Sequence, residues 1–215
     1  NGGNITTSYT YTDVVMGKYR KGFFGFSKIN SLNSLTNINT EILYENNVNV
    51  TNNTITSLIP VSIKATLNGN VISQNTYSYA YTFLGNKRFK TELSNSTSID
   101  NVNGKTLNSN YVYDGNGNVI NQTINNTGIE VFTINRPVAD FVISGTGTVP
   151  SLPKTIIEST TRGSTTFSKT TKLNYDSKGR IISKIDFDGT TNKLTTTFGY
   201  DNFGNIITTS SSGFT

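Results

Sequence analysis

The chain has 215 residues, of which 33% are hydrophobic and only 14% are charged, and its net charge is +5. It contains no Cys and no His, which excludes thiol nucleophiles, disulfides, the commonest zinc ligands and the usual general base near neutral pH. The low charge argues against a charge-driven disordered tail, and eleven Tyr and twelve Phe supply apolar anchors, so we expect a folded chain.

The chain begins with Asn1-Gly2-Gly3 instead of Met, and it has neither a signal segment nor an apolar run near the roughly 20 residues that a membrane helix needs. We therefore expect a fragment or mature segment whose targeting signals lie elsewhere, with no membrane span. The basic residues gather in two short clusters, at 18–21 and 87–90, which favours solvated strand faces over a phosphate-binding patch. No nucleic-acid partner is expected.

Residues 17–26 combine basic and aromatic side chains and end in the sequence Gly-Phe-Phe-Gly-Phe. Basic and aromatic residues together can bind single-stranded nucleic acid. The glycine spacing instead favours a tight bend that packs on the aromatic rings. We therefore assign a structural role to Gly22, Phe23, Gly25 and Phe26.

Period-two alternation of apolar and polar residues, rich in Thr, Ile, Val, Tyr and Phe, predicts strands along most of the chain. Residues 55–63 form one such run, which Pro60 interrupts, and residues 165–175 form another. Helix signals are almost absent. One strand carries three tyrosines on a single face, namely Tyr77, Tyr79 and Tyr81.

Turn signals separate these runs. Asn68-Gly69, Asn103-Gly104 and Asp188-Gly189 each predict a two-residue hairpin turn, because Asn, Asp and Gly tolerate the positive φ angles that such turns require. Residues 145–153, which contain two Gly and two Pro, form the clearest loop.

A short pattern then recurs at residues 111–119, 173–181 and 198–206. It reads aromatic or Leu, any residue, Tyr, Asp, two residues of any type, Gly, Asn or Arg, and Ile or Val. The Asp can accept hydrogen bonds from turn amides, and the Gly tolerates a left-handed conformation, so each copy predicts a hairpin turn. The residues assigned to this structural motif are Tyr113, Asp114, Gly117, Tyr175, Asp176, Gly179, Tyr200, Asp201 and Gly204.

An isolated hairpin is only marginally stable in water. Successive hairpins must therefore stack on their neighbours to bury their aromatic faces, as in a repeat array. We expect an all-β chain in which an array of antiparallel β-hairpins forms a spiralled sheet. Residues 1–60 would hold the Gly-Phe segment with strands, and residues 61–215 would hold the hairpin array, continuous with the first part.

The three copies resemble the YD repeats of the Rhs family, which includes bacterial polymorphic toxins, toxin-complex B and C components, and the animal teneurins. The segment at 17–26 is similar to the basic Gly-Phe-x-Gly-Phe segment that precedes the repeats in toxin-complex B-like proteins. The resemblance implies that the chain is a section of a hollow shell. The expected partners are flanking repeats of the same parent chain, an enclosed C-terminal toxin or other polypeptide cargo, and the secretion machinery.

The same resemblance implies a bacterial protein that is secreted or lies at the cell surface. The family's self-cleavage site has an Asp-Pro-x-Gly setting, and no Asp-Pro dipeptide occurs here, so that activity is not carried over. We expect a protein that is not an enzyme and that needs no cofactor.

Several acidic residues are candidate sites. Asp186 and Asp188 form the only tight acidic pair, but a calcium loop needs more oxygen ligands, so a plain turn is favoured. The Asp residues of the repeat all precede a turn Gly, which favours turn capping over catalysis. Two alternatives stay open: a hydrolase that uses Asp pairs, which is the weaker, and a surface adhesin or glycan-binding module that would use the tyrosines at 77–81.

Overall fold

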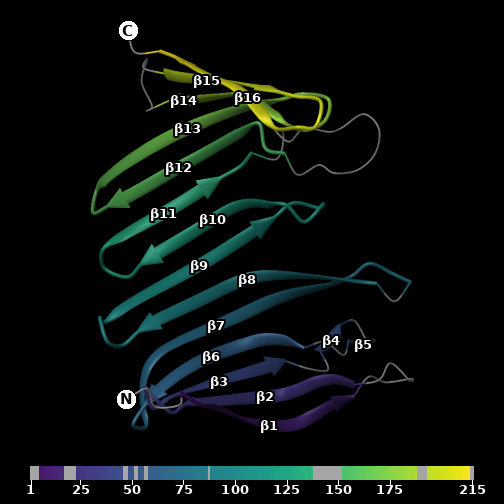
Figure 1. Ribbon diagram of the computed structural model, residues 1–215, viewed down its shortest axis with the longest axis vertical. Coiled ribbons are helices and arrows are strands. Elements are labelled where there is room, and N and C mark those ends of the chain that lie inside the picture. Colours follow the sequence, from purple (N-terminus) through teal and green to yellow (C-terminus); the bar gives the residue numbers. More distant parts are fainter. Residues whose placement is uncertain are drawn as a thin grey trace. The chain divides into compact units, whose positions relative to one another are not determined.

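The computed structural model describes residues 5–16, 23–45, 48–50, 53–55, 58–86, 88–137, 152–187 and 193–213. Fourteen strands follow one another in chain order in an antiparallel sheet, and β4 (Val48–Val50) and β5 (Asn53–Ile55) form a separate two-stranded sheet (Figure 1). The described ranges contain strands and turns but no helix, and thus no helix that could cross a membrane. The prediction of an all-β array of antiparallel hairpins is confirmed.

The chain forms two compact units, residues 1–109 and 110–215. The division expected from the sequence, at residues 60 and 61, stays a prediction. The first unit contains β1 (Thr7–Met16), β2 (Phe23–Asn33), β3 (Ile38–Glu45), β6 (Ile59–Leu67), β7 (Asn70–Phe83), β8 (Phe89–Asp100) and the start of β9 (Lys105–Tyr113).

In the first unit, strand register aligns a row of isoleucines on the face opposite a cluster of ion pairs. Ile29, Ile42 and Ile63 are aligned across β2, β3 and β6. Glu41, which precedes Ile42 and points to the other face, forms ion pairs with Lys28 and Lys64. Period-two patterning therefore separates this isoleucine row from the ion pairs, although Leu43 lies opposite Lys28 on the charged side.

Pro60 is the second residue of β6, and it lies opposite Tyr44 where the β3–β6 register shifts. A proline cannot donate a hydrogen bond to the ladder, so it is tolerated at a strand start or at an irregularity. The predicted interruption is thus accommodated at the beginning of β6.

Two of the predicted turns can be compared with the structure. Asn68 and Gly69 have φ angles of 51° and 81°, as a two-residue type I′ turn requires. The prediction for Asn103-Gly104 was wrong, because the loop between β8 and β9 has four residues, and Asp100 Oδ1 accepts bonds from the amides of Val102 and Asn103. The Asp188-Gly189 turn and residues 145–151 lie outside the described residues.

The second unit contains β10 (Val119–Asn126), β11 (Glu130–Asn135), β12 (Thr155–Arg162), β13 (Thr165–Tyr175), β14 (Ile181–Phe187), β15 (Lys193–Tyr200) and β16 (Ile206–Ser212). The bounds of β13 coincide with the alternating run predicted at 165–175. One face of β13 carries Phe167 and Leu173. The other face carries Ser168 and Thr166, whose hydroxyls bond to Ser159 and Thr161 of β12 at 2.9 Å each.

Burial is slight in both units. Among the described residues, only Val15, Leu173 and Thr171 are buried. Large apolar side chains stay exposed within strands, including Phe167 at 66% and Tyr9 at 57%. Each unit is therefore a sheet that leaves large apolar side chains exposed.

Candidate functional site: the Tyr-Asp turns

The three copies of the repeat occupy equivalent places at the ends of hairpins. Tyr113, Tyr175 and Tyr200 are the last residues of β9, β13 and β15. The Asp that follows each Tyr begins the turn, and the returning strand starts with the Val or Ile that ends each copy, at the first residue of β10, β14 or β16. The structure thus brings each Tyr, Asp and Gly of one copy together but keeps the copies in separate turns.

Each Asp closes its turn with one carboxylate oxygen. Oδ1 accepts hydrogen bonds from the backbone amides two and four residues later, at 2.8–2.9 Å in every copy. The amide of each Asp donates to the carbonyl four residues on, and the amide of each Gly donates to the Asp carbonyl, at 2.9–3.2 Å. These contacts all lie within five consecutive residues, so the motif is a local structure.

The turn glycines have positive φ angles of 90° at Gly117, 79° at Gly179 and 94° at Gly204. This is the left-handed region, where a Cβ costs on the order of 1 kcal/mol. A glycine is therefore favoured at this position by backbone conformation alone.

The side chain of the residue after each glycine donates a hydrogen bond to the second carboxylate oxygen of the turn Asp. Oδ2 accepts a bond from the side chain of Asn118 at 2.8 Å, Arg180 at 2.7 Å and Asn205 at 2.8 Å. This explains why the eighth position of the repeat is Asn or Arg, which both carry an N–H group that can reach back over the turn. Both oxygens of each Asp are thus engaged inside the turn.

Hydrogen bonding also lowers the pKa of these carboxylates and so favours their charged form. The bond from the Arg180 amide lowers the pKa of Asp176, and the bond from the Asn205 side chain lowers the pKa of Asp201. Burial raises the pKa of Asp114, but the bonds from Asn118 and the turn amides outweigh it, and the net shift is downward. All three groups are stabilised as anions, which suits a turn cap and not a general acid.

The tyrosine hydroxyls reach out of the motif to an adjacent strand. Tyr175 donates to the carbonyl of Pro153 at 2.9 Å, and Tyr200 donates to the carbonyl of Ile181 at 2.7 Å. Burial raises the pKa of Tyr175. The Tyr of the motif therefore links one hairpin to the chain segment beside it.

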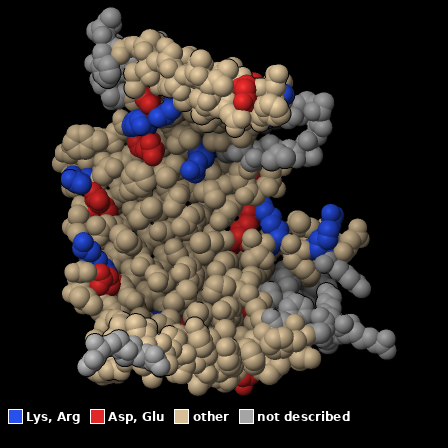
Figure 2. Space-filling model, viewed as in Figure 1, with Lys and Arg blue, Asp and Glu red and all other residues tan. Residues whose placement is uncertain are grey.

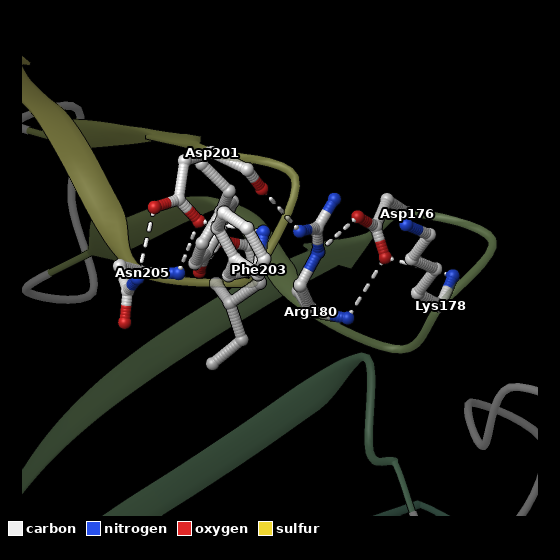
Figure 3. A network of polar contacts seen from close by, with 8 residues as sticks. Asp176, Lys178, Arg180, Asp201, Phe203 and Asn205 are labelled. Carbon is white, nitrogen blue, oxygen red and sulfur yellow. Dashed lines mark hydrogen bonds and ion pairs between the residues drawn. The ribbon is translucent and has the colours of Figure 1, made fainter.

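The second and third turns are also joined by Arg180, as Figure 3 shows. Its Nη1 atom donates to the Asp201 carbonyl at 3.4 Å, and its Cζ atom lies 4.6 Å from the centre of the Tyr200 ring. The sequence pattern did not reveal this link, because it depends on how two hairpins pair.

Tyr79 makes a similar contact outside any copy of the repeat. Its hydroxyl donates to the Pro60 carbonyl at 3.0 Å, and the neighbouring Tyr81 hydroxyl donates to Glu45 Oε2 at 2.6 Å. Burial raises the pKa of Tyr79, and burial together with the bond to Glu45 raises that of Tyr81. Sequence reasoning missed these contacts. Tyr79 and Pro60 are 19 residues apart, the same separation as Tyr200 and Ile181, and this shared spacing was the signal that could have revealed them.

The Gly-Phe segment lies partly within the described residues. Gly22 is outside them, and Phe23 and Phe26 are in β2 with ring centres 5.3 Å apart. Gly25 has a φ of 143°, and a Cβ there would lie 2.6 Å from Leu58 Cδ1. The tight bend expected in this segment does not lie at Gly25, which is within a strand, opposite Val15 and next to a register shift. Residues 17–22 lie outside the described residues, and the aromatic packing involves Tyr11 as well.

Charged residues elsewhere pair with one another. Asp186 accepts bonds from Thr171 at 2.7 Å and from Lys184 at 2.9 Å, while Asp188 lies outside the described residues. In the part of the chain that the structure describes, no three acidic side chains gather as metal ligands would. On the face drawn in Figure 2, most of the surface is uncharged, and Lys and Arg lie beside Asp and Glu.

The comparison with protein families agrees with this geometry. Residues 175–215 match the model described as RHS Repeat, and no curated protein matches the chain. The matched segment begins at Tyr175 and contains the Asp176 and Asp201 turns together with Arg180. The family is a structural repeat and not a catalytic one. Over residues 175–215 the chain is therefore similar to the RHS repeat, which supports the resemblance of the three copies to the Rhs/YD-repeat family.

Proposed function

We propose that this Rhs-type repeat chain is a wall segment of a shell that encloses a polypeptide cargo. The observation that carries the proposal is the number of large apolar side chains that stay exposed on the strands of the sheet. Among the described residues, only two apolar side chains, Val15 and Leu173, are buried, while Phe167, the third residue of β13, is 66% exposed. An apolar sheet face needs a covering partner, and large exposed apolar patches mark interaction surfaces.

The turns support a structural role and not an enzymatic one. Both oxygens of Asp176 and of Asp201 accept hydrogen bonds within the turn, which leaves these carboxylates occupied as caps. The repeated Asp residues therefore serve to close hairpins, and the hairpins serve as building units of the wall.

The proposal includes location and partners. Rhs-repeat proteins are generally secreted or surface-associated, and we infer the same for this bacterial-type chain. Its partners would be flanking repeats of the parent chain, the enclosed polypeptide and the secretion machinery. We infer no nucleic-acid partner, because Lys90, in one of the basic clusters, is paired with Glu92 at 2.8 Å.

Protease protection in the parent protein tests the proposal. We expect a downstream cargo polypeptide to resist digestion in the intact protein and to be digested readily when it is produced alone. A double variant, Asp176→Ala with Asp201→Ala, should open the wall and expose the cargo. Lys178→Ala is the matched control, because Lys178 is an exposed residue of the same turn.

Two outcomes would reject the shell. One is a parent protein with no further polypeptide to enclose, and the other is a cargo that is digested equally fast inside and outside the intact protein.

The glycan-binding alternative relied on exposed tyrosines at 77–81. Tyr79 and Tyr81 are half-buried, and their hydroxyls already bond to Pro60 and Glu45. That alternative therefore loses the observation that favoured it, and we give it no further weight.

A further inference from the structure

Arg180 occupies a place in the repeat that an asparagine fills in the other two copies. In all three copies this residue donates a side-chain bond to Oδ2 of the turn Asp, at 2.7–2.8 Å. An asparagine is therefore sufficient to close the turn. The guanidinium group of Arg180 carries N–H donors beyond the one that closes the turn.

One of these additional donors reaches the next hairpin. An arginine side chain carries several N–H donors on a rigid planar group. Nε of Arg180 bonds within its own turn, Nη1 reaches the carbonyl of Asp201 at 3.4 Å, and the group stacks 4.6 Å from the ring centre of Tyr200 (Figure 3). Arg180 thus contacts Asp176 in its own turn and, at the same time, Tyr200 and Asp201 in the next copy of the repeat.

The following hairpin makes a contact in the opposite direction. The Tyr200 hydroxyl donates to the carbonyl of Ile181, the residue directly after Arg180, at 2.7 Å. Two polar links therefore run between the same pair of hairpin ends, one from each side. Asn205, in the third copy, donates its side-chain amide to Asp201 within its own turn.

We propose that Arg180 is a latch that couples the β13–β14 hairpin to the β15–β16 hairpin, so that the ends of the two hairpins open together. In this pair of hairpins, the arginine after the turn glycine closes its own turn and also contacts its neighbour. This inference concerns cooperativity within the array, and it stands whether or not the array encloses a cargo.

The test is amide hydrogen exchange of the 215-residue chain carrying Arg180→Asn. The chain itself shows that asparagine supports the turn, so this variant removes the reach to the neighbouring hairpin and keeps the turn bond. We expect peptides from residues 193–213 to exchange roughly fivefold to tenfold faster, since a stacked cation and its hydrogen bond limit local opening. Peptides from β12 and the first half of β13 should be unchanged.

Two further variants make the result specific. Lys178→Asn removes the same charge from an exposed position of the same turn, and we expect no change in exchange. Arg180→Lys keeps the charge but loses the planar group, and we expect exchange at 193–213 close to that of Arg180→Asn. Exchange at 193–213 within twofold of the unmodified chain in Arg180→Asn would overturn the latch, as would an equal increase in Lys178→Asn.

Discussion

Hairpins of this chain are closed in two different ways, which the Asp176 turn and the Asn68-Gly69 turn represent. The Asp176 turn depends on a side chain, because a carboxylate accepts bonds from two backbone amides and from the Arg180 side chain. The Asn68-Gly69 turn depends on backbone conformation, with positive φ at both residues. The first kind can respond to pH and can be linked to a neighbour, whereas the second kind is a passive reversal of direction.

The largest effect is expected from giving each turn glycine a side chain. Gly179 has a φ of 79°, and a Cβ there would lie 3.1 Å from Leu152 Cδ1, whereas Gly69 has a φ of 81° and open space around it. Gly69→Ala should therefore cost about 1 kcal/mol of unfolding free energy, from backbone strain alone. Gly179→Ala should cost about 2 kcal/mol, because crowding adds to the same strain. Urea unfolding of both variants measures the difference, and equal losses would show that Leu152 moves aside freely.

A smaller effect is expected from acid. The pKa of Asp176 and of Asp201 lies below the ordinary value of 3.8 in the folded chain, because of the hydrogen bonds from Arg180 and Asn205 respectively. A carboxyl group with a lowered pKa stabilises the fold above pH 3.8, and that stabilisation is lost as the pH falls through the folded value. We expect hairpins β13–β14 and β15–β16 to loosen below about pH 3.8, while the Asn68-Gly69 turn, which has no titratable group, keeps its structure.

Amide exchange or chemical shifts recorded between pH 2 and pH 6 can follow this transition. The double variant Asp176→Asn with Asp201→Asn serves as the control, since it should be less stable at neutral pH and should lose the acid transition. An acid transition that persists unchanged in this variant would place the sensitive group elsewhere.

The smallest effect is expected from Asn68→Gly. Glycine adopts positive φ readily, so the type I′ turn should keep its geometry, and the unfolding free energy should change by less than about 0.5 kcal/mol. Thermal unfolding monitored by circular dichroism is sufficient to check this. A loss above 1 kcal/mol would show that the Asn68 side chain contributes bonds of its own, and the contrast with the Asp turns would then be weaker than we describe.

The turns differ in how well the sequence predicted them, and the reason is physical. Asp114, Asp176 and Asp201 form turns whose contacts lie within five residues, so a local pattern was enough to recognise them. The four-residue loop before β9 was misread, because Asp100, three residues before Asn103, captures the amides of Val102 and Asn103. A dipeptide signal alone cannot reveal such a competing cap.

Strand register was the other source of error. Gly25 was expected in a bend, but it lies within β2 beside a register shift, where Leu58 approaches it. Such shifts arise when paired strands accommodate unequal numbers of residues, which depends on both strands together. No single segment of sequence contains that information.

The sequence by itself determined the all-β class, the alternation of faces and the chemistry of the Tyr-Asp-x-x-Gly turns, because these follow from backbone preferences and contacts between near neighbours. Only the tertiary structure decided that Arg180 reaches Asp201 and Tyr200, and that Tyr79 bonds to Pro60. These contacts join residues about 20 positions apart, and they form only when antiparallel pairing brings the ends of neighbouring strands side by side.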